Sequence, residues 1–109
     1  MEPIKKELTQ KELFDVMERL EEEGVETVLV DTILKPLPGF PSMTLNPPEM
    51  KKMKPGTLFV FYCDTGKSTM ERLPAFERQF PDHRVASLRG GRSRWRETLV
   101  SAYLSRKKD

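Results

Sequence analysis

Apolar runs that alternate with helical patterns constrain the fold of this chain more than any other feature of its sequence. The runs are continuous enough to be typical of buried strands, and they lie at 25–31, 57–62 and 85–88. Apolar residues at helical spacing lie before, between and after them, at 9–24, 68–80 and 93–108. Because strands that alternate with helices form parallel sheets covered on both faces, the sequence predicts an α/β fold.

Shorter segments complete this expectation. Residues 4–8 suit a short edge strand, and residues 42–45 suit another short strand. Residues 46–53 begin with two prolines at positions that need no N–H, so we expect one or two helical turns there. Pro74 lies inside the helical pattern at 68–80, where it predicts a kink or two short helices.

The first helix carries its own boundary signals. Thr9 is placed as its N-cap, and Glu12 three residues later completes a capping box. Gly24 is well placed to end it.

The size of the chain and its few metal-binding residues narrow the class of protein. A length of 109 residues predicts one domain spanning 1–109. The chain has one cysteine and one histidine, His83, so we expect no intrachain disulfide and no metal site. We also expect no cofactor. No apolar run is long enough to span a membrane, and the N-terminus lacks a signal-peptide pattern. We therefore expect a soluble, cytoplasmic protein.

Charge is distributed unevenly along the chain. Residues 1–54 carry eight basic and eleven acidic side chains, whereas residues 55–109 carry eleven and six. The cysteine thus lies in a basic half that suits an anionic ligand, although such charges also commonly form a solvated helix surface. The stretch "RGGRSRWR" at 89–96 resembles an RNA-binding composition, but a Gly-Gly loop between a strand and a helix explains it better. We expect neither a nucleic-acid partner nor a membrane partner.

The only cysteine, Cys63, follows the most continuous apolar run and precedes a helix. The N–H groups and partial positive charge of a helix N-terminus lower the pKa of a thiol. Gly66 allows a tight loop whose amides point inward, and Lys67 adds a full charge. This pattern indicates a nucleophilic sulfur beside an anion site. The alternative is that Cys63 is a buried small apolar residue.

Two motif families with a strand–loop–helix arrangement do not fit. A phosphate-binding P-loop requires a glycine where this chain has Phe61. The tyrosine-phosphatase type requires an arginine six positions after the cysteine, where this chain has Thr69.

Four segments in order resemble the signatures of a single-domain rhodanese. They are "VDT" at 30–32, "GFPSMTLNP" at 39–47, "FVFYCDTGKST" at 59–69 and "SLRGGRSRW" at 87–95. The resemblance covers almost the whole chain, and "YCDTG" with "LRGGRSRW" is its most specific part. It implies a rhodanese-like fold, with about five parallel strands and helices on both faces.

The resemblance also implies a function, that of a thiosulfate or persulfide sulfurtransferase. Cys63 would be the catalytic residue, which takes sulfane sulfur from a small anionic donor and passes it to cyanide or to a thiol, including a protein thiol. The backbone amides of residues 64–68 would stabilise the persulfide. The substrate-binding residues would be Asp64, Thr65, Gly66, Lys67, Ser68 and Arg92.

Several positions depart from the family pattern. Ser68 stands where active members often have arginine, so that the nearest cation is Lys67, and Asp64 adds a negative charge beside the cysteine. Phe40 replaces a histidine, and Ile33 replaces an arginine. These departures leave an alternative function open, a non-catalytic rhodanese-like module that binds a partner or has a regulatory role.

Further residues have ordinary expected roles. Leu34, Leu37 and Phe40 form either an apolar binding rim or, more simply, the anchors of their loop. We expect Trp95 to pack a helix against the sheet and His83 to be solvated in a turn.

Overall fold

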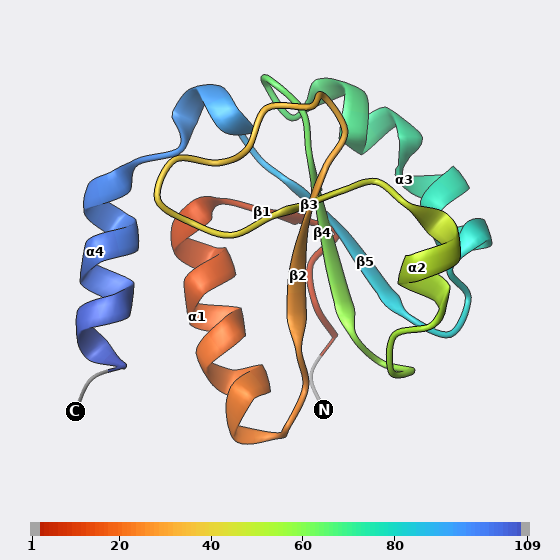
Figure 1. Cartoon of the computed structure of the whole chain (residues 1–109), viewed down its shortest axis with the longest axis horizontal. Coiled ribbons are helices and arrows are strands. Elements are labelled where there is room, and N and C mark those ends of the chain that lie inside the picture. The colour runs from red at the N-terminus through yellow and green to blue at the C-terminus, as the bar shows by residue number, and fades with distance from the viewer. Residues whose placement is uncertain (1–2, 108–109) are drawn as a thin grey trace.

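Within residues 3–107, five parallel strands form one sheet in the order β1-β5-β4-β2-β3. The computed structural model describes residues 3–107 (Figure 1). The strands are β1 (Glu7–Leu8), β2 (Thr27–Asp31), β3 (Met43–Thr44), β4 (Leu58–Tyr62) and β5 (Arg84–Leu88). The helices are α1 (Gln10–Glu22), α2 (Pro47–Lys51), α3 (Lys67–Gln79) and α4 (Glu97–Arg106), with a 3-10 turn at Arg92–Arg94. The predicted α/β architecture is confirmed.

The central strand β4 explains the continuous apolar run. It pairs with β2 on one side and with β5 on the other, and all five of its residues are buried. Its side chains alternate between two hydrophobic layers. A strand that is buried on both faces favours apolar side chains at successive positions, which explains the continuous apolar run.

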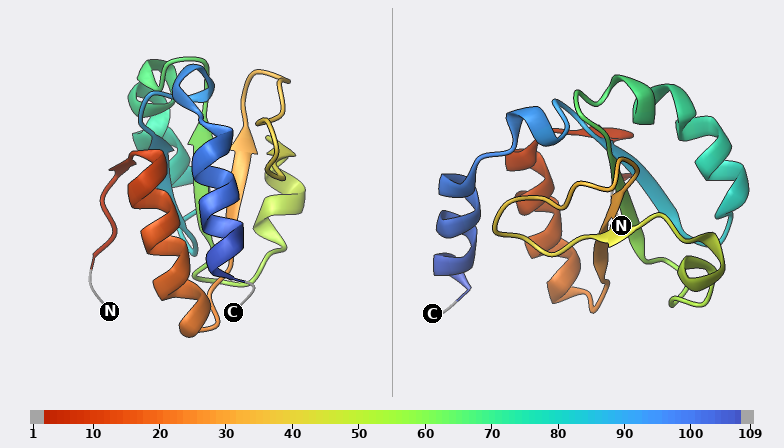
Figure 2. Two further views of the ribbon diagram at one scale, coloured as in Figure 1. Left: turned by 90° about the vertical axis from the view of Figure 1, so that its left-hand side faces the viewer. Right: turned by 45° about the horizontal axis from the view of Figure 1, so that its top comes forward.

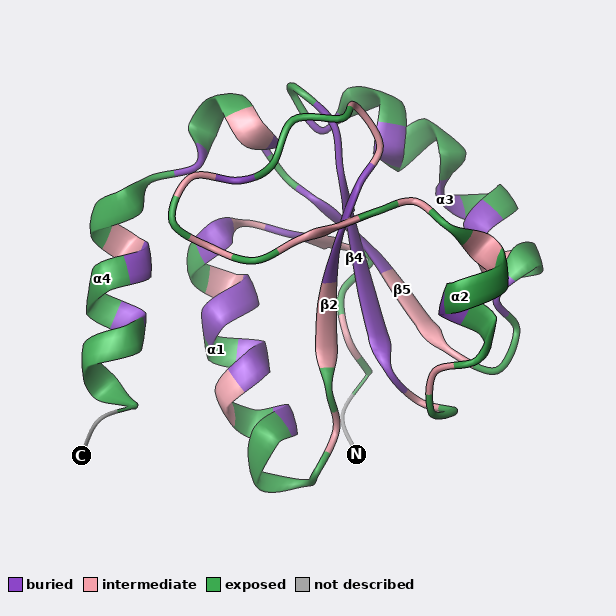
Figure 3. Ribbon diagram, in the orientation of Figure 1, coloured by how far each residue is buried: buried purple, intermediate pink, exposed green. Residues whose placement is uncertain are grey.

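Two helices cover each face of the sheet (Figure 2). Helices α1 and α4 pack on one face, where the ring of Phe14 stacks on that of Tyr103 with centroids 4.5 Å apart. Helices α2 and α3 pack on the other face, where the rings of Phe61 and Phe76 stack at 3.8 Å. The buried positions of these helices lie on the sides that face the sheet (Figure 3).

The capping box of α1 is confirmed. The backbone N–H of Glu12 donates to the hydroxyl of Thr9 at 3.1 Å, and the N–H of Thr9 donates to the carboxylate of Glu12 at 3.0 Å. The helix ends at Glu22, and Gly24 follows with a positive φ of 74°. The expected short strands and the short helix at Pro47 also form.

Helix α3 does not divide at Pro74. It runs continuously from Lys67 to Gln79, although Pro74 lies inside it. Pro74 is exposed, whereas Leu73 and Phe76 are buried against the sheet. Packing of the buried side therefore stabilises the helix against the missing N–H. None of the helices within residues 3–107 has the length and apolar character needed to cross a membrane.

Helix α4 starts later than the sequence pattern predicts. It begins at Glu97, because Arg92–Arg94 form the 3-10 turn and Trp95 has an extended backbone. Trp95 therefore packs from a loop and not from the helix. The indole N–H of Trp95 donates to the carbonyl of Pro38 at 3.0 Å, a contact between segments that are distant in sequence.

Candidate active site

The carboxyl ends of β2, β4 and β5 lie at one edge of the sheet, at the top in Figure 1. The loop from Cys63 to Gly66 leaves β4 at this edge and leads into α3. In open parallel sheets, ligands bind at this edge. We name residues 63–66 the cysteine loop.

Gly66 fixes the turn of the cysteine loop. It is the N-cap of α3 and has a left-handed backbone, with φ 91° and ψ −9°. A Cβ atom at this position would lie 2.7 Å from the carbonyl oxygen of Leu88 and 3.0 Å from the backbone nitrogen of Gly90. Both the backbone conformation and the space therefore require glycine here.

The sulfur of Cys63 is held by hydrogen-bond donors. The backbone N–H of Gly66 donates to Sγ at 3.2 Å, and the hydroxyl of Thr69 lies 3.6 Å from Sγ. The residue is 5% exposed. Burial raises the pKa of the Cys63 thiol, but hydrogen bonds from the N–H groups of Thr69, Gly66 and Thr65 and from the Thr69 hydroxyl outweigh it, so the pKa lies below its ordinary value. Sequence reasoning expected this direction.

The remaining predicted residues of the cysteine loop and helix start face solvent. Asp64, Thr65, Lys67 and Ser68 are all exposed. The hydroxyl of Thr65 accepts a hydrogen bond from the backbone N–H of Lys67 at 3.4 Å. The structure thus brings the backbone of this segment to the sulfur, whereas these four side chains lie at the rim.

Arg92 binds neighbouring loops through its backbone and its side chain. Its backbone N–H donates to the carbonyl of Cys63 at 2.9 Å, and its Nε donates to the carbonyl of Pro36 at 3.0 Å. Ser93 also donates its N–H to the carbonyl of Asp64 at 2.9 Å. The segment after β5 therefore clamps the cysteine loop, and part of the Arg92 guanidinium is engaged in this structural role.

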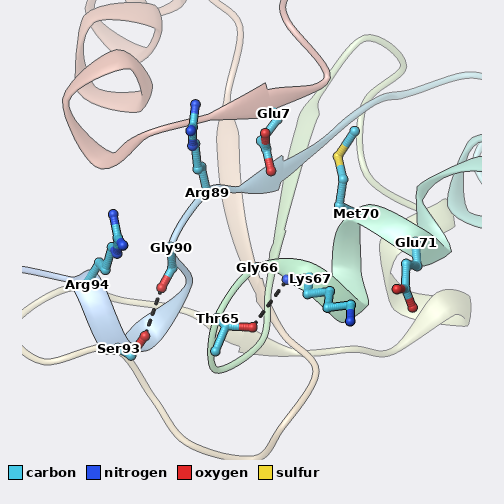
Figure 4. Close-up of a pocket in the computed structure, with 10 residues that line it drawn as sticks. All are labelled: Glu7, Thr65, Gly66, Lys67, Met70, Glu71, Arg89, Gly90, Ser93 and Arg94. Carbon is cyan, nitrogen blue, oxygen red and sulfur yellow. Dashed lines mark hydrogen bonds between the residues drawn. The ribbon is translucent and has the colours of Figure 1, made fainter.

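A pocket of about 630 Å³ lies beside the cysteine loop (Figure 4). Cys63 is not among its lining residues, which are Glu7, Thr65, Gly66, Lys67, Met70, Glu71, Arg89, Gly90, Ser93 and Arg94. Three of these carry positive charge and two carry negative charge. The predicted Lys67 lines this pocket, while the arginines of the basic stretch that reach it are Arg89 and Arg94, not Arg92.

Two buried hydroxyls next to the sulfur had no role in the sequence-based prediction. They belong to Thr69 and Ser87, both 0% exposed, and their oxygens lie 2.8 Å apart. Thr69 lies in the first turn of α3, so its spacing from the cysteine is a local signal that could have been used. Ser87 lies on β5 and approaches only because β5 neighbours β4, so no local pattern identifies it.

The loop after β2 is anchored rather than open. Asp31 is buried and accepts a hydrogen bond from the N–H of Ile33 at 2.8 Å. The hydroxyl of Tyr62 donates to the carbonyl of Lys35 at 2.7 Å and lies 3.2 Å from the Ser42 hydroxyl. Burial, together with Asp31, raises the pKa of Tyr62 to about 12, so this hydroxyl stays protonated in more alkaline solution than an ordinary tyrosine does.

The apolar residues of this loop mostly anchor it. Leu37 is buried, and Phe40 packs between the rings of Phe14 and Trp95. Leu34 alone points outward, at 76% exposure, from a backbone with φ 58°. The apolar rim is thus reduced to one side chain.

The expectation that His83 is solvated is wrong. Its ring is half-buried and stacks on Phe59 with centroids 4.9 Å apart. Its Nε2 lies 2.9 Å from the carbonyl oxygen of Met53. His83 therefore joins the turn before β5 to the turn before β4, at the edge of the sheet opposite the cysteine.

Comparisons with known proteins found similarity only among solved structures. No family model matches the chain, and no curated protein matches it. A solved structure of a protein from Lactobacillus plantarum is 13% identical, with a TM-score of 0.53, and the match covers 86% of this chain and 84% of that one. A rhodanese homolog from the extremely thermophilic bacterium Thermus thermophilus is 24% identical, with a TM-score of 0.46, over 80% of this chain and 96% of that one. The expected fold, five parallel strands with helices on both faces, is confirmed by the sheet and the two hydrophobic layers of the described residues.

Proposed function

We propose that this protein is a rhodanese-type sulfurtransferase whose Cys63 carries sulfur as a persulfide. One observation supports this most directly: the sulfur lies at the start of α3 and accepts a hydrogen bond from the Gly66 N–H at 3.2 Å. The hydrogen bonds that hold the pKa of Cys63 below its ordinary value favour the reactive thiolate. The segments that resemble single-domain rhodaneses point to the same chemistry.

The reaction has two steps. The Cys63 thiolate attacks the outer sulfur of thiosulfate, the bond between its two sulfur atoms breaks, and sulfite leaves with the electron pair. The new bond is a persulfide on Cys63. A thiolate or cyanide then attacks the outer sulfur of this persulfide, and Cys63 leaves as a thiolate. The reaction requires no cofactor, and its two half-reactions predict ping-pong kinetics.

The groups around the sulfur have distinct roles in this proposal. Backbone amides of the cysteine loop stabilise the negative sulfur of the thiolate and of the persulfide. Lys67 at the rim attracts the anionic donor, while Asp64 opposes it. The acceptor is a small or protein-borne thiol, and we propose that the reaction occurs in the cytoplasm.

Intact-protein mass spectrometry tests the proposal. After incubation with thiosulfate, polysulfide or a persulfide donor, the mass should increase by one sulfur atom, and cyanide should remove it. The Cys63→Ser variant should fold and gain nothing. Absence of an adduct with all three donors, or a sulfur adduct that persists in Cys63→Ser, would contradict the proposal.

A second candidate function is a non-catalytic rhodanese-like binding module. The observation that favours it is the small exposure of Cys63, 5%, beside a pocket that Cys63 does not line. The same mass measurement separates the two functions, because a binding module gains no sulfur from any donor.

A further inference from the structure

Two buried hydroxyls form a chain from the sulfur of Cys63 into the sheet. Thr69 Oγ1 lies 3.6 Å from Sγ and 2.8 Å from Ser87 Oγ. Ser87 Oγ in turn lies 3.5 Å from the carbonyl oxygen of Gly66. Thr69 belongs to α3 and Ser87 to β5, and both are 0% exposed. The sulfur is therefore connected to a carbonyl of its own loop through hydroxyls from two other elements.

Each hydroxyl carries one proton and donates one hydrogen bond at a time. A thiolate only accepts, so Thr69 donates to the sulfur, and Thr69 can in turn accept from Ser87. A protonated thiol can donate to Thr69, which then donates to Ser87, and Ser87 donates to the Gly66 carbonyl. This carbonyl also accepts the N–H of Met70 at 3.2 Å, so it has a donor in both arrangements. Every proton of the chain thus finds an acceptor whether the sulfur is charged or neutral.

We propose that Ser87 is a positioning residue that, by donating to Thr69, directs the Thr69 hydroxyl proton to the Cys63 sulfur, and that this chain reverses when the sulfur is protonated. When the thiol ionises, its proton leaves to solvent and the two hydroxyls rotate about their C–O bonds. No O–H bond breaks. The Thr69 hydroxyl has a competing acceptor, the Gly66 carbonyl oxygen at 3.4 Å. A hydrogen bond that Thr69 accepts from Ser87, at 2.8 Å, favours donation to the sulfur over donation to this carbonyl.

The pKa of Cys63 supports this assignment, since the Thr69 hydroxyl is one of the groups that lower it. The segments that meet at the cysteine also carry charged or titratable side chains. They are Asp64 on the cysteine loop, Lys67 at the start of α3, Arg92 after β5, Asp31 at the end of β2 and Tyr62 at the end of β4. None of these side chains is substituted in the variants below, so a change in the alkylation midpoint of Cys63 is assigned to the loss of a hydroxyl.

The test is the rate of alkylation of Cys63 by iodoacetamide as a function of pH. Thr69→Val should raise the midpoint by about one pH unit, and Ser87→Ala by roughly half a unit, since the second hydroxyl acts only through the first. Adding Ser87→Ala to Thr69→Val should produce no further shift. Thr69→Ser retains the hydroxyl and should restore the parent midpoint.

Thr57→Val is the matched control. Thr57 is another buried threonine, whose hydroxyl donates to the Lys54 carbonyl before β4, and its loss should leave the midpoint unchanged. Equal shifts from Ser87→Ala in both backgrounds, or no shift in either, would overturn the proposal.

A measurement on the parent protein covers the case in which Ser87→Ala fails to fold. The ¹³Cβ resonance of Ser87 should titrate with the midpoint of Cys63 alkylation, and a resonance that ignores this titration would overturn the proposal. The proposal rests on Cys63 being the reactive thiol of the proposed function. Alkylation needs no sulfur transfer, so the mass measurement and this titration fail separately.

Discussion

At the scale of single residues, hydrogen bonds, and not neighbouring charges, are the main causes that lower the pKa of the Cys63 thiol against the effect of burial. The causes that lower its pKa are the amides of the loop and helix start and the hydroxyl of Thr69. We expect the alkylation midpoint of the parent protein to lie below about 8.5, the value of a free thiol. Below that midpoint the sulfur retains its proton and reacts slowly, and above it the thiolate reacts at its full rate. A midpoint at or above the free value would show that burial outweighs the donors.

Substitution of Lys67 measures how much a positive charge at the rim contributes to the use of an anionic donor. This lysine is exposed at the rim and has no side-chain partner within residues 3–107. Screening by solvent limits its effect, so Lys67→Ala should lower kcat/KM for dianionic thiosulfate by about three- to tenfold, with a smaller loss for a singly charged donor. Asp64→Asn should raise kcat/KM for thiosulfate, because it removes a negative charge from the same rim.

Lys54→Ala is the control for Lys67→Ala. Lys54 is also exposed but precedes β4, at the far edge of the sheet. If both lysine variants changed thiosulfate kinetics by the same factor, the effect would come from net charge and not from the rim.

At the scale of elements, the cysteine loop is held by the segment that follows β5. A Cβ atom at Gly91 would overlap the carbonyl oxygen of Cys63 and would lie 2.7 Å from that of Asp64. The backbones of the two segments therefore touch where they cross. Gly24 offers a comparison, since it also has positive φ but nothing lies within 4 Å of its hypothetical Cβ.

This contrast predicts the cost of two substitutions. Gly24→Ala should lower the free energy of unfolding by about 1 kcal/mol, from backbone strain alone. Gly91→Ala should cost about 1–3 kcal/mol more, because the loops must also separate. Urea denaturation measures both, with the Cys63 alkylation rate as a local readout. Equal costs and an unchanged rate would mean that the loops move apart freely.

At the scale of the whole molecule, the sheet separates two hydrophobic layers that share only β4 and its neighbours. Tyr103→Phe removes a 2.7 Å hydrogen bond to Glu21 on one face, and Phe76→Leu removes a ring stacked on Phe61 on the other. We expect each to cost about 1 kcal/mol or more, and the double variant to be additive within about 0.5 kcal/mol. Thermal or urea unfolding checks this, and a larger coupling would show that the layers respond as one.

The same scale explains how much the sequence could predict. Strands with buried faces, the capping box of α1 and the position of Cys63 all follow from local patterns and are present in the structure. Local sequence patterns did not predict the position of a side chain where a contact with a residue distant in sequence determines it. Trp95 lies before α4 and not in it, with its indole hydrogen-bonded to Pro38, and the His83 ring stacks on Phe59 instead of facing solvent. Ser87 lies close to the hydroxyl beside the sulfur only because β5 pairs with β4.

The crossing of backbones at Gly66 and Gly91 bears on any attempt to move this site elsewhere. A protein engineer who grafts residues 63–69 alone onto another parallel-sheet scaffold would carry over the cysteine and its helix start. The graft would lack the N–H groups of Arg92 and Ser93, which bind the carbonyls of Cys63 and Asp64, and the close-fitting glycine of the other segment. The portable unit is therefore a pair of segments, 63–69 with 87–94, transferred together with the spacing between two adjacent strands.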